Sequence, residues 1–221
     1  MNKRMKRKNL IFILLVLILP SVLALNISSP ENKWYNEKTV PVYITNDLES
    51  DFYYSLNYSS RWVSLCADTL ICNTTIRVRE EGENNITIKS VNENGKVNQS
   101  EVKFMIDSKN PRILKQGTLD RQFVNKKGFF INYSEKNVKE ITLFYNGENK
   151  TKNCPNSTEQ KEEQECIFND ADIVSNLTSL DGSYLGFWFT ITDIAGNEIT
   201  SKRRTVVGVD TTDPVVKFNS T

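Results

Sequence analysis

The residues of this sequence whose side chains could do chemistry are four cysteines, a set of asparagine sequons and many acidic residues; histidine is absent. Without histidine, the chain cannot build Ser-His-Asp or Cys-His catalysis, and it lacks a usual ligand of catalytic zinc. The acidic residues gather in turn-like stretches such as 46–51, 79–84 and 159–165, where solvated charge is the ordinary interpretation. A carboxylate pair for glycoside hydrolysis is the alternative. We expect that this chain is not an enzyme.

The four cysteines fall into two close pairs. Cys66 and Cys72 lie six positions apart, and Cys154 and Cys166 lie twelve positions apart. Neither pair has the Cys-x-x-Cys spacing of a zinc site or a thioredoxin-like site. Of the three pairings that four cysteines allow, the two local disulfides are favoured, because the other two would tie one half of the chain to the other. Disulfides that close loops this short stabilise a small domain by about 2–3 kcal/mol each. Four free thiols are the disfavoured alternative.

Asparagine sequons, Asn-x-Ser/Thr, occur ten times, which is more often than random placement of the same residues gives. They begin at Asn26, Asn57, Asn73, Asn85, Asn98, Asn132, Asn149, Asn156, Asn176 and Asn219. Such an excess favours the glycosylated surface of an exported protein. The alternative is a β protein rich in Asn, Ser and Thr, whose turns and exposed strand faces generate sequons that carry no sugar.

The amino terminus has the pattern of a secretory signal peptide. Residues 1–24 contain five basic residues and no acidic residue, and an apolar run from Leu10 to Leu19 is followed by modest side chains at Val22 and Ala24. The run is shorter than the ~20 apolar residues that span a bilayer, so a permanent anchor is the weaker alternative. The whole chain has 28 basic and 27 acidic residues, which leaves 23 and 27 without the leader. A net acidic chain of this kind is not expected to bind nucleic acid.

Alternation of apolar and polar residues dominates the rest of the chain. Short runs rich in Val, Ile, Thr, Tyr and Phe cover residues 40–45, 74–80, 85–91, 101–106, 128–133, 140–145, 185–192 and 204–209. Such runs, separated by Asn, Gly and Asp turns, predict antiparallel sheets packed face to face. Residues 169–180 could form at most a short helical turn. We predict an all-β fold of two β-sandwiches in tandem.

The period-two alternation also assigns side chains to the core. In residues 185–192 the core face is formed by Leu185, Phe187, Phe189 and Ile191. In the first half of the chain this role falls to Ile86, Ile88 and, after a change of phase, Val91. Trp62 is the predicted large residue between the sheets, since aromatic residues at strand spacing lie in the core more often than on the surface. The alternative places Trp62 and Trp188 on the surface as ligand-stacking residues.

The sequence is similar to itself at a spacing of about a hundred residues. In both "FMIDSKNPRI" (104–113) and "VVGVDTTDPVV" (206–216), an apolar run is followed by an Asp and then by a Pro, and Gly82 and Gly182 open similar segments upstream. A period of this size fits an array of independent domains. We predict a signal peptide over 1–24, β-sandwiches over 25–108 and 109–209, and a linker with the start of a third module over 210–221. The chain is therefore expected to continue beyond Thr221, unless its last strand folds back or is donated to a neighbour.

These segments resemble a known class of surface domain. Residues 180–216 resemble the second half of a prokaryotic Ig-like, or fibronectin-III-like, repeat, in which a strand is followed by a D-x-x-G-N turn, another strand and a V-D-T-T-x-P link. The opening "NISSPENKWYNEKTVPVYIT" resembles the start of such a repeat in exported archaeal and bacterial proteins. The cysteines depart from the antibody pattern, because their spacing is too short for the distant B–F disulfide. The likeness covers most of residues 26–218 and is weak in 114–170.

The resemblance implies a role outside the cell. It implies a non-enzymatic structural or adhesive module of a stalk, adhesin or surface layer, which meets cell-surface proteins or glycans and touches a membrane only through its leader or an unseen anchor. The alternative is a carbohydrate- or protein-binding accessory domain of a secreted enzyme. Binding is expected at loop ends, such as residues 46–54 and 110–122, because loops carry recognition on a fixed scaffold.

Three acidic residues stand at turns where adjacent modules would meet. Asp193, Asp210 and Asp213 could supply oxygen ligands to Ca²⁺, and the earlier link offers only Asp107. The preferred alternative is that these side chains bond their own backbone in Asx turns. No other metal or cofactor is expected.

Overall fold

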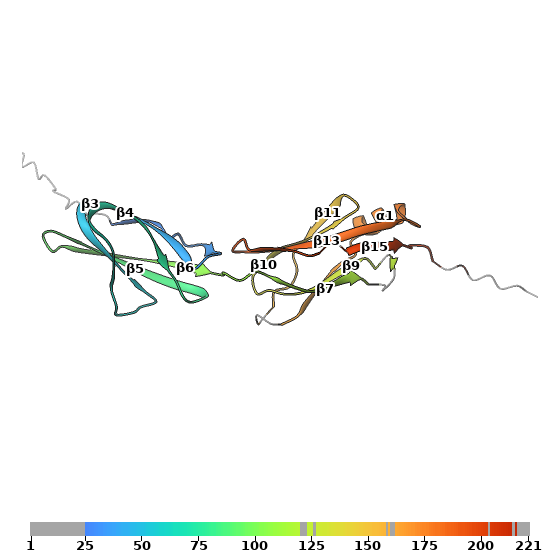
Figure 1. The fold of residues 1–221 in the computed structure, drawn as a ribbon, viewed down its shortest axis with the longest axis horizontal. Coiled ribbons are helices and arrows are strands. Elements are labelled where there is room, and N and C mark those ends of the chain that lie inside the picture. The colour runs from blue at the N-terminus through green and yellow to red at the C-terminus, as the bar shows by residue number, and fades with distance from the viewer. Residues whose placement is uncertain are drawn as a thin grey trace, which may run out of the picture.

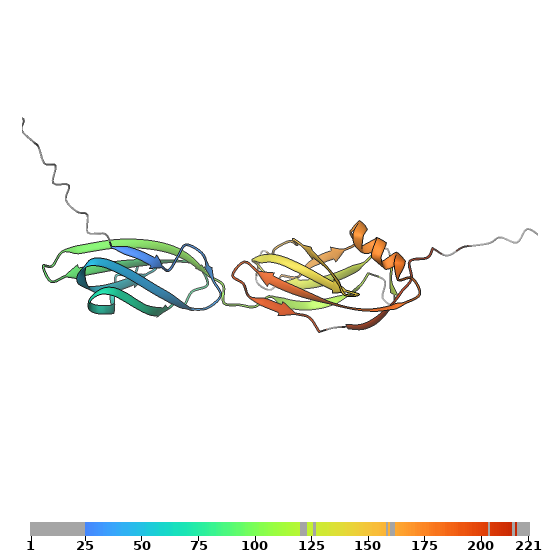
Figure 2. The same ribbon diagram turned by 90° about the horizontal axis from the view of Figure 1, so that it is seen from above.

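The computed structural model describes residues 25–119, 123–125, 127–157, 159, 162–202, 204–213 and 215. Its strands form two β-sandwiches that lie end to end along the long axis of the molecule (Figures 1 and 2). We call the strands within residues 26–106 the first sandwich, and the elements within residues 112–209 the second sandwich. The predicted all-β fold of two tandem Ig-like sandwiches is confirmed. The predicted leader, residues 1–24, lies outside the described residues.

Two long strands pass through both layers of the first sandwich. Its strands are β1 (Asn26–Ser29), β2 (Trp34–Tyr35), β3 (Thr39–Leu56), β4 (Val63–Arg77), β5 (Gly82–Asn92) and β6 (Val97–Ile106). Residues 39–45 of β3 pair with β1 and with the last part of β4, whereas residues 50–56 pair with β5 and residues 50–54 with the first part of β4. β6 pairs with β5, and β2 pairs with β6 in parallel. One layer is therefore β1–β3–β4, and the other is β4–β3–β5–β6–β2.

The inward side chains of both layers form one apolar core. Its members are Val40, Val42, Ile44, Phe52, Cys72, Ile76, Val78, Ile86, Ile88, Phe104 and Ile106. The predicted core residues Ile86 and Ile88 are fully buried. The predicted change of phase is wrong, because Ser90 stays on the inner face at 1% exposure while Val91 is only half-buried.

Trp62 does not lie between the sheets, so that prediction is wrong. It precedes β4 and is 36% exposed. The Lys89 Nζ lies 4.5 Å from the centre of the Trp62 ring and 5.0 Å from that of Tyr53, so the ammonium contacts two aromatic rings on the outside of the sheet. The Trp62 indole is therefore packed against the Lys89 ammonium and not buried in the core.

The second sandwich has the same order of strands in each layer. One sheet is β7 (Arg112–Thr118), β9 (Phe129–Ser134) and β12 (Gln164–Phe168). The other runs β11 (Glu148–Lys152), β10 (Val138–Tyr145), β13 (Tyr184–Asp193), β15 (Arg204–Val209) and β8 (Phe123–Val124), with β14 (Glu198–Thr200) also on β13. β8 pairs with β15 in parallel, as β2 does with β6.

Alternation along β13 supplies one face of the second core, as predicted. Leu185, Phe187, Phe189 and Ile191 are at most 4% exposed. Trp188 lies on the opposite face, where its ring stacks on Phe144 with centroids 5.1 Å apart. Phe189 contacts Phe168 of β12 across the sandwich at 5.5 Å, so aromatic side chains fill the space between the sheets.

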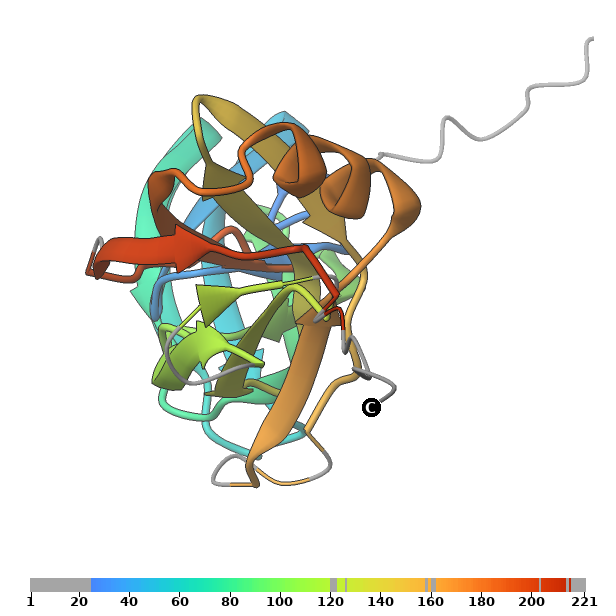
Figure 3. The same ribbon diagram turned by 90° about the vertical axis from the view of Figure 1, so that its right-hand side faces the viewer.

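A helix, α1 (Ala171–Ser179), joins β12 to β13. It lies outside the sheets next to β11 (Figures 1 and 3), where Lys150 Nζ pairs with Asp172 at 2.6 Å. Its buried residues, Ile173 and Leu177, are four positions apart and pack into the core. The element is longer than the short turn predicted for residues 169–180. No helix in the described ranges is long and apolar enough to cross a membrane.

Both predicted disulfides, Cys66–Cys72 and Cys154–Cys166, are present. Cys66 and Cys72 lie in the two parts of β4 that form the edges of opposite layers, and Cys154 follows β11 while Cys166 lies in β12, again at opposite edges. Each disulfide therefore closes its sandwich along the same side.

Candidate functional site

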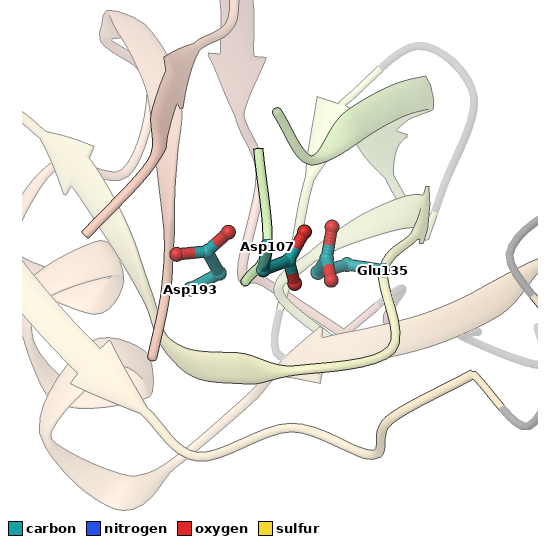
Figure 4. Close-up of side chains that lie close together, drawn as sticks. All are labelled: Asp107, Glu135 and Asp193. Carbon is teal, nitrogen blue, oxygen red and sulfur yellow. The ribbon is translucent and has the colours of Figure 1, made fainter. Parts of the chain in front are cut away.

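Three carboxylates meet where the two sandwiches join. Asp107 follows β6 of the first sandwich, Glu135 follows β9, and Asp193 ends β13 of the second sandwich. One oxygen of each lies within 4.8 Å of the others, and Figure 4 shows Asp107 between the other two side chains. Asp107, Glu135 and Asp193 are 8%, 6% and 0% exposed. Buried carboxylates are costly unless they are hydrogen-bonded, so their partners define what the site does.

The D-x-x-G-N turn after β13 satisfies Asp193. Gly196 adopts a φ of +91°, a conformation that favours glycine, and the turn returns Asn197 to Asp193. Asn197 donates to Asp193 Oδ1 from its backbone N–H (2.8 Å) and to Oδ2 from Nδ2 (2.7 Å). The buried carboxylate is therefore held within its own turn.

Asp107 is bonded by both sandwiches. Its backbone N–H donates to the carbonyl of Tyr35 in β2 (3.0 Å), which belongs to the first sandwich. Its own carbonyl accepts from Asn197 Nδ2 (2.7 Å), and its Oδ2 accepts from Asn137 Nδ2 (2.6 Å), both of the second sandwich. The residue between the sandwiches is thus fixed from either side.

Glu135 is bonded by residues of the second sandwich. Its Oε1 accepts from the backbone N–H of Asn137 (2.9 Å), and its backbone N–H donates to Ser157 Oγ (3.2 Å). Burial raises the pKa of the Glu135 carboxyl above its usual value, and the nearby charges of Asp107 and Asp193 raise it further. The surroundings therefore favour either a proton on Glu135 or a cation among the three groups.

The oxygens of this junction are of the kind that hard cations bind. Ca²⁺ takes six to eight oxygen ligands, and Asp107, Glu135 and Asp193 would supply three carboxylates. In the structure, amide groups of Asn137 and Asn197 donate to all three carboxylates. The calcium candidates from the sequence were Asp193, Asp210 and Asp213, and of these only Asp193 belongs to this group of three carboxylates.

The structure does not bring together the three acidic residues that the sequence singled out. Asp193 lies at one end of β13, whereas Asp210 lies beside the start of that strand, because Gly182 N–H bonds the carbonyl of Val209. Asp210 and Asp213 are exposed. Asp210 Oδ1 accepts from the backbone N–H of Thr212 (3.3 Å), which is the Asx turn that was the preferred alternative.

Glu135 was not predicted as a site residue. It stands in "SEKN", directly after a predicted strand, and its only signal is an acidic side chain at the end of that strand. Asn137 and Asn197 were also missed, because their role depends on how the second sandwich meets Asp107.

The two links leave their sandwiches in the same way. Asp107 N–H bonds Tyr35 in the first link, and Asp210 N–H bonds the carbonyl of Val124 (3.1 Å) in the second. Lys109 N–H donates to Asp107 Oδ1 at 3.3 Å, the counterpart of the Asx turn at Asp210. The two similar sequence stretches, 104–113 and 206–216, therefore also form similar backbone hydrogen bonds at Asp107 and Asp210.

A carboxylate one residue before a glycine anchors each link. Glu81, before Gly82, accepts from the backbone N–H (3.0 Å) and the Oγ (2.7 Å) of Ser108. Asp181, before Gly182, accepts from the backbone N–H (2.5 Å) and the Oγ1 (2.9 Å) of Thr211. The first residues of both links are therefore hydrogen-bonded to the sandwich that precedes them.

One sequon asparagine, Asn85, is buried in the structure. Asn85 lies in β5 with 3% of its surface exposed, and its Nδ2 donates to Tyr58 Oη (3.3 Å) and to Glu101. A sugar there would displace this packing. Asn219 lies outside the described residues. The other eight sequon asparagines are exposed or half-buried, namely Asn26, Asn57, Asn73, Asn98, Asn132, Asn149, Asn156 and Asn176, and their glycosylation remains a prediction.

The segments predicted as binding loops are mostly strands. Within 46–54, residues 50–54 pair in β3 with β5 and β4; within 110–122, residues 112–118 form β7. Residues 46–49 lie within β3, between the parts that pair in the two layers, and Asp47 and Leu48 line a hollow at this end of the first sandwich. Residues 120–122 lie outside the described ranges.

No protein-family model matches the sequence, and no curated protein matches it significantly. Among solved structures, the fibronectin(III)-like modules of Clostridium thermocellum CbhA share 11% identity with a TM-score of 0.44, over 89% of this chain and 100% of that chain. A bacterial ice-binding adhesin shares 12% identity with a TM-score of 0.32, over 86% and 65%. The Bacteroides ovatus protein SGBP-B, in complex with a mixed-linkage heptasaccharide, shares 13% identity with a TM-score of 0.30, over 83% and 47%. These likenesses concern the fold alone.

Proposed function

We infer that this chain is a non-enzymatic structural or adhesive module of the cell surface, in which two sandwiches form a rigid spacer. The observation that carries this proposal is the bonding of Asp107 by both sandwiches: Tyr35 on one side, Asn137 and Asn197 on the other. A flexible linker would leave its backbone to water, and inter-domain motion is the ordinary expectation for such a chain. The buried, satisfied link opposes that motion.

The rest of the link adds to its stiffness. Ser108 is bonded to Glu81 of the first sandwich, and Pro111 is buried just before β7. Proline fixes its own φ and restricts the residue before it, so the chain enters the second sandwich with few accessible conformations. A spacer made this way can hold a distal part at a fixed distance from the envelope.

The second link supports a row of modules. Asp181 holds Thr211 as Glu81 holds Ser108, and Asp210 presents an exposed carboxylate where Asp107 presents a buried one. We therefore divide the chain into modules over residues 25–108 and 109–209, followed by a link that begins at residue 210.

The two disulfides support the proposed placement outside the cell. Disulfides such as Cys66–Cys72 and Cys154–Cys166 persist in oxidising compartments and are rare in the cytosol. The signal-peptide pattern of residues 1–24 and the exposed sequons agree with export to the surface of a prokaryotic cell, where the neighbours of the chain would be surface proteins or glycans.

A second candidate is an accessory binding domain of a secreted enzyme. The arginine-lined hollow described below favours it, since a pure spacer has no use for such a hollow.

Surface labelling tests the proposal. An antibody fragment against the second sandwich should label intact, unpermeabilised cells of the source organism, and brief protease treatment of those cells should remove the label. Labelling that requires permeabilisation would contradict a surface role.

A further inference from the structure

A hollow of about 670 Å³ opens in the first sandwich, and none of the three junction carboxylates lines it. One wall is the end of β3 with the loop that follows it, and the other is the end of β4 with residues 78–80. The polar and charged residues of its lining include Arg61, Arg77, Arg79, Ser55, Asn57 and Ser59. Three arginines on one concave surface are the feature to be explained.

The arginines concentrate positive charge on residues 25–221, which are net acidic with 23 basic and 27 acidic residues. Among the described residues, none of the three guanidinium groups forms an ion pair or a side-chain hydrogen bond. The neighbouring Lys38 is neutralised by Glu81 at 3.0 Å, and Glu80 is the acidic residue of the lining. Exposed guanidinium groups without acidic partners are suited to bind carboxylates from outside, because their planar forks match that geometry.

A buried asparagine ties the two walls together. Asn84, 1% exposed, donates from Nδ2 to the carbonyl of Glu80 (3.2 Å), and its Oδ1 accepts from Asn57 Nδ2 (3.0 Å). Asn57 Oδ1 in turn accepts from the backbone N–H of Asn85 (2.9 Å). The loop wall and the β4 wall are thus held at a fixed separation, as a preformed binding site requires.

Each wall is also fixed on its own. Asn57 and Tyr58 adopt φ values of +50° and +58°, a sparsely populated conformation that persists when the surroundings hold it. On the other wall, Lys38 bonds Val78 N–H through its carbonyl (2.8 Å) and donates from Nζ to the Arg79 carbonyl (2.9 Å). The arginines therefore project from two rigid segments.

The remaining lining selects the class of ligand. Hydroxyl and amide groups of Asn57 and Ser59 can bond sugar hydroxyls, and Val63, which is 36% exposed, adds an apolar side chain for the C–H side of a sugar. A long polyanion such as nucleic acid would meet the net negative charge of residues 25–221, whereas a short acidic saccharide meets only the local arginines. We propose that this hollow binds a saccharide that carries carboxylates, through Arg61, Arg77 and Arg79. The arginines take no part in the bonding of Asp107, so the proposal stands or falls independently of the spacer.

The test uses chain produced in a host without N-glycosylation. Trigalacturonate and sialyllactose are the acidic probes, methyl-esterified trigalacturonate is the neutral control, and a short polyglutamate peptide is the non-sugar control; binding is followed by NMR chemical-shift titration. Arg77→Gln with Arg79→Gln is compared with Lys96→Gln with Lys139→Gln, which removes the same charge from exposed positions elsewhere. Thermal melting confirms that each variant is folded.

At least one acidic saccharide should bind, the methyl ester should not, and the double arginine variant should weaken binding by about tenfold or more. The lysine variant should bind like the parent chain. Three results would overturn the proposal: neither acidic saccharide binds; both double variants bind equally well; or polyglutamate binds as tightly as the saccharides, which would assign the hollow to acidic peptides.

Discussion

Glu135 is the residue at which burial and neighbouring charge act in the same direction. Both raise its pKa, since the carboxylate form is poorly solvated and faces Asp107 and Asp193. A group whose pKa is higher in the folded than in the unfolded chain contributes stability that is complete below its unfolded pKa, near 4.5, and is lost as the pH rises through the folded value. At neutral pH the charged Glu135 therefore costs stability.

The substitution Glu135→Gln should raise the melting temperature at pH 7, in buffer with a chelator. Glutamine keeps an oxygen that can accept from Asn137 N–H but carries no charge. The difference from the parent chain should shrink as the pH falls towards 4.5, because the parent carboxyl then takes up its proton. Thermal melts followed by circular dichroism over this pH range provide the measurement.

Glu93→Gln, at the exposed tip of the first sandwich, is the control and should leave the melting temperature unchanged. A variant at Glu135 that melts below the parent at pH 7 without metal would refute the assignment of cost to its charge. Adding Ca²⁺ distinguishes a protonated Glu135 from a bound cation. If Ca²⁺ raises the melting temperature of the parent chain but not that of Glu135→Gln, the three carboxylates form a cation site. If Ca²⁺ leaves the melting temperature of the parent chain unchanged, calcium does not bind there.

Sequence reasoning at this scale found Asp107 and Asp193 as acidic residues in turns but grouped Asp193 with the wrong partners. The hydrogen bonds within a turn involve neighbouring residues, so the turn at Asp193 can be predicted from "DIAGN". The contact between this turn and Asp107 depends on how the two sandwiches pack, which the local sequence does not show. The prediction for Trp62 was wrong for a related reason, because Lys89, which contacts the Trp62 ring, is distant in the sequence.

Among the elements, the turn before β9 places the strictest demand on a single residue. Gly128 has a φ of +82°, and a Cβ added there would lie 2.0 Å from the carbonyl oxygen of Phe168. Gly147 has a similar φ of +79°, but a Cβ there would meet open space. Comparing alanine variants at the two glycines therefore separates the free-energy cost of a positive φ from the cost of a steric clash at the added Cβ.

Gly147→Ala should therefore destabilise the second sandwich by about 1 kcal/mol, the cost of the left-handed conformation. Gly128→Ala should cost about 2 kcal/mol more, because backbone must shift to admit the methyl group. Urea unfolding of both variants measures the difference. Equal losses would show that the approach of Phe168 does not constrain the turn.

The disulfide Cys154–Cys166 is predicted to stabilise the second sandwich by about 3 kcal/mol, through the restricted unfolded chain. Replacing both cysteines by serine should lower the urea midpoint of that sandwich and leave the first unchanged, as observed by residue-resolved NMR. Loss of structure in both sandwiches together would mean that they unfold as one unit.

The strands themselves were predictable, because alternation such as that of residues 185–192 directly encodes two faces. The crossing of β3 from one layer to the other was not, since residues 46–49 carry no glycine or proline to mark it. Helix α1 was underestimated because only Ile173 and Leu177 face the core, which is too few for a visible 3.6-residue period.

Over the whole molecule, stiffness depends on one residue that both sandwiches bond. The repeated Asp and Pro of the links predicted a joint at residues 107–111, and the paired anchors Glu81 and Asp181 show how such a joint is built. The donors from the second sandwich, Asn137 and Asn197, convert the joint into a fixed contact.

Distances between spin labels at Gln99→Cys and Lys139→Cys, one exposed position on each sandwich, test this claim most directly by double electron–electron resonance. The account predicts a single narrow distribution in the parent chain and a broad one when Asn137 and Asn197 are both replaced by alanine in a chain that still folds. A broad distribution in the parent chain, or an equally narrow one in the alanine variant, would contradict it.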